Sequence, residues 1–169
     1  VSYGKKNMKR IQDFCGLDVD DNGFLYTIDS TYGRIFLYDR ECNLLNAFGG
    51  GVGQGTQLGT FEIPSAIAVD PSGQRLLVTD MNRLTLTLFE ETEYGSQAKR
   101  ARTFTMDGDY ESAKPLWEDV LRSDRNNQQA LRSLAEASLL EKDFYKAMEY
   151  ARLGFDQDTY AQAFVAIRN

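Results

Sequence analysis

Residues 16–29 read "GLDVDDNGFLYTID" and residues 66–80 read "AIAVDPSGQRLLVTD". The two stretches align with Asp20 opposite Asp70, at a spacing of 50 residues, and with a glycine three positions after each of these aspartates. One residue is inserted after the glycine of the second stretch, and the alignment then continues to the aspartate that ends each stretch. An internal repeat of about 50 residues therefore organises the first half of the chain.

Each copy of the repeat alternates short apolar segments with turn residues, a pattern typical of antiparallel strands. Both copies predict three strands, the third being "RIFLY" (residues 34–38) in the first copy and "TLTLFE" (residues 85–90) in the second. Only the first copy continues into a fourth segment, "NLLNAF" (residues 43–48). A repeat of this length with about four strands is typical of a β-propeller blade, so we expect two blades with about seven strands.

A glycine-rich stretch, "FGGGVGQGTQLG" at residues 48–59, connects the two copies. It does not have the pattern of a phosphate-binding loop: Thr56 follows Gly55 where a P-loop needs lysine, and its glycines do not fit the dinucleotide-binding spacing. The stretch is therefore interpreted as a turn between two blades.

Residues 13–90 resemble the NHL-repeat family of β-propellers. The first copy matches the family pattern of an apolar-Val-Asp strand, a glycine turn, an apolar strand ending in Asp and an Arg-Ile-x-apolar-aromatic strand. The second copy departs from it at "MNRL" (residues 81–84), where the family has Asn-His-Arg, and in lacking the fourth strand. The resemblance implies a partial propeller, with residues 1–12 a tail or the end of a preceding blade.

The composition changes near residue 91, where β-branched residues give way to Ala, Glu, Leu, Lys and Arg at helical spacing. Residues 91–169 are therefore predicted to be a helical domain. The complete chain then has an α+β fold, with the strands first and the helices after them. The expected helices are residues 92–106, 110–122, 128–140, 144–155 and 158–168.

A second period, of 34 residues, relates Asp109 to Asp143 and the residues around them. This period and its pattern resemble the tetratricopeptide (TPR) family, which implies a stacked helical array. Pro115 departs from the family pattern and is expected to remove one backbone hydrogen bond and kink its helix. Large apolar residues at these positions are predicted to pack in the core: Trp117, Leu134, Phe144 and Leu153.

Composition excludes several kinds of site. The chain has no histidine, the usual general base and zinc ligand, and its two cysteines, Cys15 and Cys42, are too few for a zinc site. Both cysteines are predicted to be free and structural, because the topology places them about 15 Å apart. The net charge is −6, so nucleic acid is not an expected partner, and the basic cluster "KKNMKR" at residues 5–10 is interpreted as a solvated tail. No apolar run is long enough to span a membrane.

The acidic turn of the first copy also resembles a calcium loop. Asp18, Asp20 and Asn22 have the spacing of oxygen ligands, and Asp29 stands where an EF-hand has its closing glutamate. The competing explanation is a strand, a turn and a strand, because the matching residues of the second copy cannot supply three such ligands. A calcium site therefore stays the alternative, and no cofactor is predicted.

A first-helix face of the helical array is a candidate peptide-binding surface. The residues that it would present are Arg102, Met106, Gln129, Arg132, Glu136 and Leu139. The alternative is an ordinary solvated face.

The function that these features favour is a non-enzymatic scaffold that binds a protein or peptide through NHL blades and TPR helices. The alternatives are a calcium- or carbohydrate-binding surface domain and the non-catalytic part of an NHL-type enzyme. Two blades leave apolar faces and sheet edges open, so we expect that the helices or a second chain cover them, or that further blades lie before Val1. The last alternative is favoured, which makes the chain the expected C-terminal part of a longer protein; self-association through the open edges is the expectation if it is not. Resemblance to bacterial proteins that join NHL blades to TPR helices suggests an extracytoplasmic location.

Overall fold

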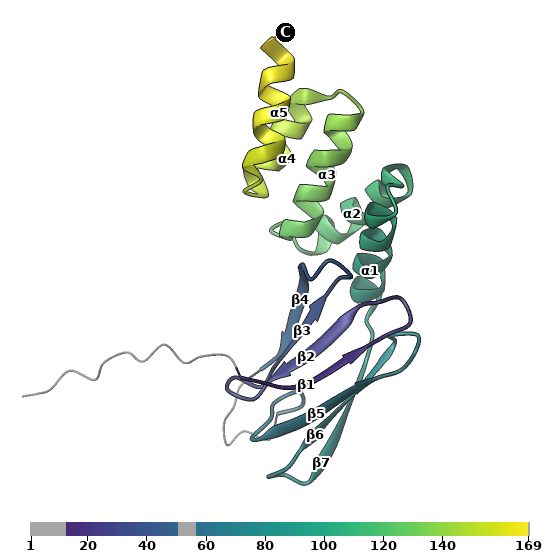
Figure 1. The fold of residues 1–169 in the computed structure, drawn as a ribbon, viewed down its shortest axis with the longest axis vertical. Helices are drawn as coiled ribbons and strands as arrows, with labels where there is room; N and C mark the ends of the chain where they lie inside the picture. The colour runs from purple at the N-terminus through teal and green to yellow at the C-terminus, as the bar shows by residue number, and fades with distance from the viewer. Residues whose placement is uncertain (1–12, 51–56, 169) are drawn as a thin grey trace, which may run out of the picture. The chain divides into compact units, whose positions relative to one another are not determined.

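The structure is a computed structural model that describes residues 13–50 and 57–168. Contacts divide the chain into two compact units, one ending at Glu91 and the other beginning at Thr92. The first unit is all strand and the second all helix, as the predicted α+β class requires (Figure 1). The basic cluster at residues 5–10 and the centre of the glycine-rich stretch lie outside the described residues.

Seven antiparallel strands form two sheets in the first unit, so the predicted number of strands is confirmed. Sheet 1 has the order β1-β2-β3-β4, and sheet 2 has the order β5-β6-β7. The strands of sheet 1 are β1 (Phe14–Val19), β2 (Leu25–Asp29), β3 (Arg34–Tyr38) and β4 (Leu44–Gly49). Those of sheet 2 are β5 (Pro64–Val69), β6 (Arg75–Asp80) and β7 (Thr85–Glu90).

The two sheets repeat each other residue by residue. Leu17 pairs with Thr27 in sheet 1, and Ile67 pairs with Val78 at the matching position of sheet 2. The same irregularity, a register shift one residue after the start of the first strand, occurs in both sheets. Positions in the first strands therefore correspond at a spacing of 50 residues, and positions in the second and third strands at 51.

An aspartate organises the turn between the first two strands of each sheet. The Asp20 carboxylate accepts hydrogen bonds from the backbone N–H groups of Asn22 and Phe24, both at 3.0 Å. The Asp70 carboxylate accepts from the backbone of Gln74 at 2.8 Å in the second copy. Gly23 has a φ of +80° in this turn, a left-handed conformation that favours glycine. These local bonds explain why the two turns share their Asp and Gly.

A second aspartate, at the end of the second strand, joins the turn that follows it to the segment that enters the first strand. The Asp29 carboxylate accepts from the backbone N–H groups of Asp13 and Thr31 at 2.9 and 3.0 Å. The Asp80 carboxylate does the same in sheet 2, accepting from the backbone of Glu62 at 2.6 Å and of Asn82 at 3.0 Å. Each of these carboxylates therefore fastens three segments of its sheet with backbone hydrogen bonds.

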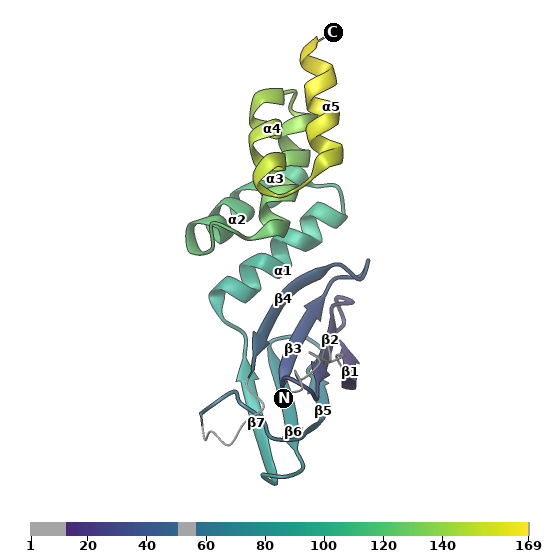
Figure 2. The ribbon, with the colours of Figure 1, turned by 90° about the vertical axis from the view of Figure 1, so that its left-hand side faces the viewer.

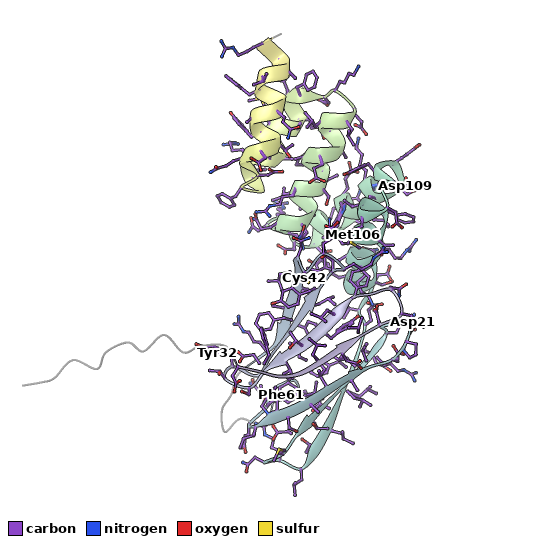
Figure 3. All side chains as sticks on the ribbon, in the orientation of Figure 1. Asp21, Tyr32, Cys42, Phe61, Met106 and Asp109 are labelled. Atoms are coloured by element: carbon purple, nitrogen blue, oxygen red, sulfur yellow. The ribbon has the colours of Figure 1, made fainter. Side chains whose placement is uncertain are left out.

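Aromatic rings fill the space between the two sheets. Phe61 is 1% exposed and lies between them (Figure 3). The ring of Phe89 on β7 lies 6.1 Å from that of Phe61 and 5.9 Å from that of Phe48 on β4, measured between centroids. The contact between the sheets thus extends from their inner strands to β4 and β7.

The second unit contains five helices, the predicted number, which contact each other in sequence order (Figure 2). They are α1 (Glu93–Met106), α2 (Tyr110–Ser123), α3 (Gln128–Leu140), α4 (Phe144–Leu153) and α5 (Gln157–Arg168). The predicted end of α4 at residue 155 is wrong by two residues. Gly154 caps the helix and Phe155 adopts a φ of +52°, which breaks the helical conformation.

The turns before α2 and α4 have the same structure, 34 residues apart. Asp109 and Asp143 are the N-caps, and each side chain accepts from the backbone N–H three residues later. The residues before them, Gly108 and Lys142, both adopt a left-handed conformation, with φ values of +79° and +62°. The sequence period therefore corresponds to a structural period in the described helices.

The predicted packing residues of the helical unit differ in burial. Trp117 and Leu134 are each 1% exposed, and the Trp117 indole donates to the Thr105 hydroxyl at 2.9 Å. Phe144 is half-buried, whereas Leu153 is 48% exposed in the last turn of α4, so its predicted burial is wrong. Helix α2 continues through Pro115 as one element.

We call the set of backbone hydrogen bonds to the Asp80 carboxylate the Asp80 clasp. It determines how the stability of the β unit should change in acid. Burial acts to raise the pKa of the Asp80 carboxyl, but hydrogen bonds from the backbone of Arg83, Glu62, Ile63 and Asn82 outweigh burial and hold that pKa below its usual value. The stabilisation is therefore complete above the unfolded pKa of about 3.9, and it is lost as the pH falls through the lower folded value.

We expect Asp80→Asn to lower the free energy of unfolding at pH 7 by about 1–3 kcal/mol, because the amide NH₂ group would face two backbone donors. The difference from wild type should persist at pH 5 and shrink below about pH 4, measured by urea denaturation at each pH. Asp21→Asn, on an exposed turn residue, is the control. A difference that grows on acidification would contradict this explanation.

Candidate functional site

One face of sheet 1 packs against sheet 2, and its burial gives the standard for comparing the other sheet faces of this chain. Its side chains alternate with those of the opposite face along each strand. Tyr26, Ile28, Ile35 and Leu37 are 4%, 0%, 0% and 6% exposed. Gly16 lies at the point of closest approach, where an added Cβ would come within 3.0 Å of the Ile67 backbone nitrogen. We call this the covered face.

Polar groups fix the register of the covered face against sheet 2. The Asp18 carboxylate accepts from the backbone N–H of Val69 at 2.7 Å, and the backbone N–H of Asp21 donates to the Pro71 carbonyl at 3.0 Å. The Tyr26 hydroxyl lies 3.3 Å from the Gly73 carbonyl, to which it donates. Burial, and then the negative charge of Asp20, raise the pKa of Tyr26, so this hydroxyl stays protonated.

Within the first unit, no described residue covers the other face of sheet 2. Leu77 on β6 and Leu86 and Leu88 on β7 are 43%, 70% and 52% exposed. Ala66 and Ala68 on β5 are also exposed on this side, where Ala68 pairs with Leu77. These five residues form the open face of sheet 2. A contiguous exposed apolar face of this kind is typical of an interaction site.

Sheet 1 also has an open face, on the side away from sheet 2. Leu17 and Val19 are 62% and 48% exposed there, and the Phe14 ring packs edge-on against Phe36 at 5.8 Å between centroids. This face contains a hollow of about 600 Å³, which Leu25, Tyr38 and Cys42 also line. The lining is mainly apolar, which is appropriate for a hydrophobic contact rather than for a charged ligand.

Because the two sheets are repeats of one another, each residue on an open face has an equivalent residue on a face that lies at the contact between the sheets. The open face of sheet 2 corresponds to the covered face of sheet 1, with Leu77 in the place of Tyr26 and Leu86 in the place of Ile35. Residues that are buried in one copy are therefore exposed in the other. The difference arises within the β unit, where sheet 2 covers the first face and no other described strand covers the second.

The polar groups of the covered face are missing from the open face of sheet 2. Ala68 replaces Asp18, Leu77 replaces Tyr26, and Pro71, which has no N–H, replaces Asp21. The open face therefore keeps the apolar character of its counterpart but loses the three groups that fix the register.

The predicted calcium ligands are brought together only in part, since Asn22 and Asp20 share one turn, in which the Asn22 backbone N–H donates to the Asp20 carboxylate at 3.0 Å. Asp18 binds the Val69 backbone, Asp20 binds its own turn, and Asp29 lies at the far end of β2. Five residues of strand separate the last two by about 15 Å. Among the described residues, no group of three or more acidic or cysteine side chains is placed to hold a metal ion.

The predicted peptide-binding residues are divided between two helices. Arg102 and Met106 lie on α1, and the other four lie along α3. Arg102 is only 8% exposed, and two of the α3 residues contact neighbouring helices. The Arg132 guanidinium donates to the Gly154 carbonyl at 3.0 Å, and Glu136 accepts from the Tyr110 hydroxyl at 3.3 Å. Gln129 and Leu139 are half-buried. The peptide surface stays a prediction, and several of its residues stabilise helix packing.

The last helix also has an apolar stripe. Tyr160, Phe164 and Ile167 are 37%, 44% and 36% exposed, and their spacing places them on one side of α5.

None of the described helices is both long and apolar enough to cross a bilayer.

Comparisons with known proteins assign no family. The sequence matches none of the protein-family models and none of the curated proteins with which it was compared. The NHL and TPR resemblances therefore stay predictions, and the internal repeats stand on the geometry described above.

The open faces were expected from the sequence in general terms, but their residues were not identified. The informative signal is the alternation in β7, where Leu86 and Leu88 alternate with Thr85, Thr87 and Phe89. An apolar residue at every second position predicts one buried face. The sequence alone does not say which of two apolar faces its neighbour covers.

Both cysteines are free, as predicted, but they differ in environment. Cys42 is exposed, which contradicts a purely structural role. The Cys15 thiol is half-buried between the sheets and donates to the Pro64 carbonyl at 3.1 Å. Burial raises the pKa of Cys15, which lowers its fraction of reactive thiolate.

We expect an aromatic disulfide reagent at pH 8 to modify Cys42 first and Cys15 at least about tenfold more slowly. The measurement uses the variants Cys42→Ser and Cys15→Ser, so that each thiol is followed alone. Urea should equalise the two rates as the sheets separate. Equal rates in the native protein would show that Cys15 is not protected at the interface.

Proposed function

We propose that this chain is a non-enzymatic scaffold that binds another protein, and that the open face of sheet 2 is its main binding surface. The observation that supports the proposal is the exposure of Leu77, Leu86 and Leu88 on a face whose counterpart in sheet 1 is fully buried. A surface with the composition of an interface, on a rigid sheet, is suited to protein binding.

The rigidity of this surface comes from the other side of the same sheet. Val78 is 0% exposed and Leu76 is 4% exposed beneath it, against sheet 1. The Asp80 clasp fixes the turn between β6 and β7. A partner would therefore bind an ordered surface and lose little free energy in ordering it.

The outer edge of β7 offers backbone hydrogen-bonding groups to a partner, in addition to the apolar side chains. In sheet 1, β3 pairs with β4, but within the described residues no strand pairs with the outer edge of β7. Its free backbone groups can accept an added strand, a recurring mode of peptide recognition. The helical unit, whose α5 exposes its own apolar stripe, would extend the scaffold.

A photo-crosslinking residue at position 88 tests the proposal. In cells that naturally express the chain, position 88 should give one protein adduct that competing wild-type chain removes and competing Leu88→Glu chain does not. The matched control is the same residue at Thr85, on the same strand but the opposite face. Adducts of equal yield at both positions, or none at position 88, would refute the proposed surface.

A further inference from the structure

We propose that the open face of sheet 2 docks onto the open face of sheet 1 in a second copy of this chain, head to tail. The inference rests on the proposed scaffold function, because it names the protein that one of its surfaces binds. Its basis is the interface inside the chain, where one face of sheet 2 packs on the covered face of sheet 1.

The open face of sheet 1 is the structural counterpart of the face with which sheet 2 covers sheet 1. Leu17 corresponds to Ile67, since each occupies the same register position on the first strand of its sheet. Tyr38 corresponds to Phe89, at the same position on the third strand. Two apolar residues that sheet 2 presents to its neighbour, Ile67 and Val69, thus have exposed equivalents on sheet 1, in Leu17 and Val19, whereas Tyr38 is half-buried.

The open face of sheet 2 is in turn the counterpart of the covered face. Inside the chain, the covered face of sheet 1 contacts the inner face of sheet 2. The open face of sheet 2 is equivalent to the first of these faces, and the open face of sheet 1 is equivalent to the second. The two open faces should therefore fit each other as the two contacting faces do. Within the β unit, no described residue covers either face, so the β unit of a second copy can supply the complementary surface to both. Such a contact is heterologous, with different patches on the two partners.

The centre of this contact requires a small shift between the sheets. The covered face has Gly16 where the sheets approach most closely, and the open face of sheet 2 has Ala66 there, the next smallest residue. An Ala66 methyl group at the equivalent position would meet the backbone of Leu17, so the two sheets must lie a few tenths of an ångström further apart than they do within the chain.

The docking between copies should be weaker than the contact within the chain. Ala68, Leu77 and Pro71 remove the three polar contacts that fix the register inside the chain. What remains is apolar, and two copies each with a net charge of −6 repel each other. Added salt should therefore strengthen the association, because it screens the repulsion and leaves apolar contacts intact.

The head-to-tail geometry limits the assemblies that can form. Repeated contacts give a ring if the rotation closes and a filament if it does not. Because rings of four to eight sheets are known for propeller architectures, two to four copies of this two-sheet chain would close one.

Sedimentation velocity of the purified full chain tests the inference, from about 1 µM to about 300 µM, the range of weak interfaces. Leu88→Glu blocks the open face of sheet 2, and Leu17→Glu blocks that of sheet 1; both residues are exposed, so folding should be retained and is checked by circular dichroism. Leu140→Glu, on an exposed apolar residue of α3, is the control.

We expect the wild type and the control to associate as concentration rises, and each blocked variant alone to stay monomeric. An equimolar mixture of the two blocked variants should form a dimer and nothing larger, because only one complementary pair of faces remains. A wild type that stays monomeric throughout would overturn the inference, as would association that the two variants leave unchanged. A mixture without dimers would overturn it too.

The two proposals fail separately. An adduct from position 88 to a different protein, with a monomeric purified chain, would retain the scaffold function and overturn the docking of a second copy. Absence of any specific adduct, the chain itself included, would overturn both.

Discussion

A small β-sheet has two faces, and in this chain the burial of one face against a neighbouring sheet is the contact on which the β unit depends. Sheet 1 has four strands and sheet 2 has three, and sheets of this size need an apolar face to be stable. Their contact buries Ile28, Ile35 and Val78 completely. The Asp18 carboxylate then fixes the register by binding the Val69 backbone, a residue on the other sheet. Apolar burial provides the stabilisation, and one charged hydrogen bond selects its geometry.

The same constraint explains what is left exposed. Stacking repeats bury the faces between them and leave one face free at each end. In the β unit those ends are the open faces of the two sheets, and in the helical unit the stripe on α5 has the same origin. Residues 131, 135 and 138 of α3 are buried, whereas Tyr160, Phe164 and Ile167 of α5 are partly exposed because no described helix follows. Exposed apolar surface in this chain is thus a property of where a repeat lies, not of its sequence alone.

The sequence predicted the elements well because their signals are local. Asp20 and Gly23 specify a turn through hydrogen bonds within five residues, and Asp109 specifies a helix start in the same way. The end of α4 was missed because Phe155 adopts a left-handed conformation that a phenylalanine rarely takes. Leu153 was misassigned because its burial depends on a neighbouring element rather than on its own helix.

The candidate site was harder to predict than the fold. Arg102, Arg132 and Glu136 have the residue types of a peptide-binding surface, but one is buried and two hold helices together. Asp18 has the spacing of a calcium ligand, yet its partner, Val69, is 51 residues away. Spacing describes neighbours along the chain, whereas these roles are decided by residues from other elements. For Leu86 and Leu88 the error has the opposite sign: an apolar strand face predicts burial, but these two residues are exposed.

Native-state hydrogen exchange of the Val69 amide, followed by NMR, tests whether the two sheets form one tightly registered interface. This N–H donates to Asp18 across the interface. We expect this amide to exchange only through global unfolding of the β unit, with the same free energy as the amides of β2. Exchange of Val69 at low free energy, while the amides of β2 stay protected, would show that the sheets separate without unfolding and that no tightly registered interface holds them.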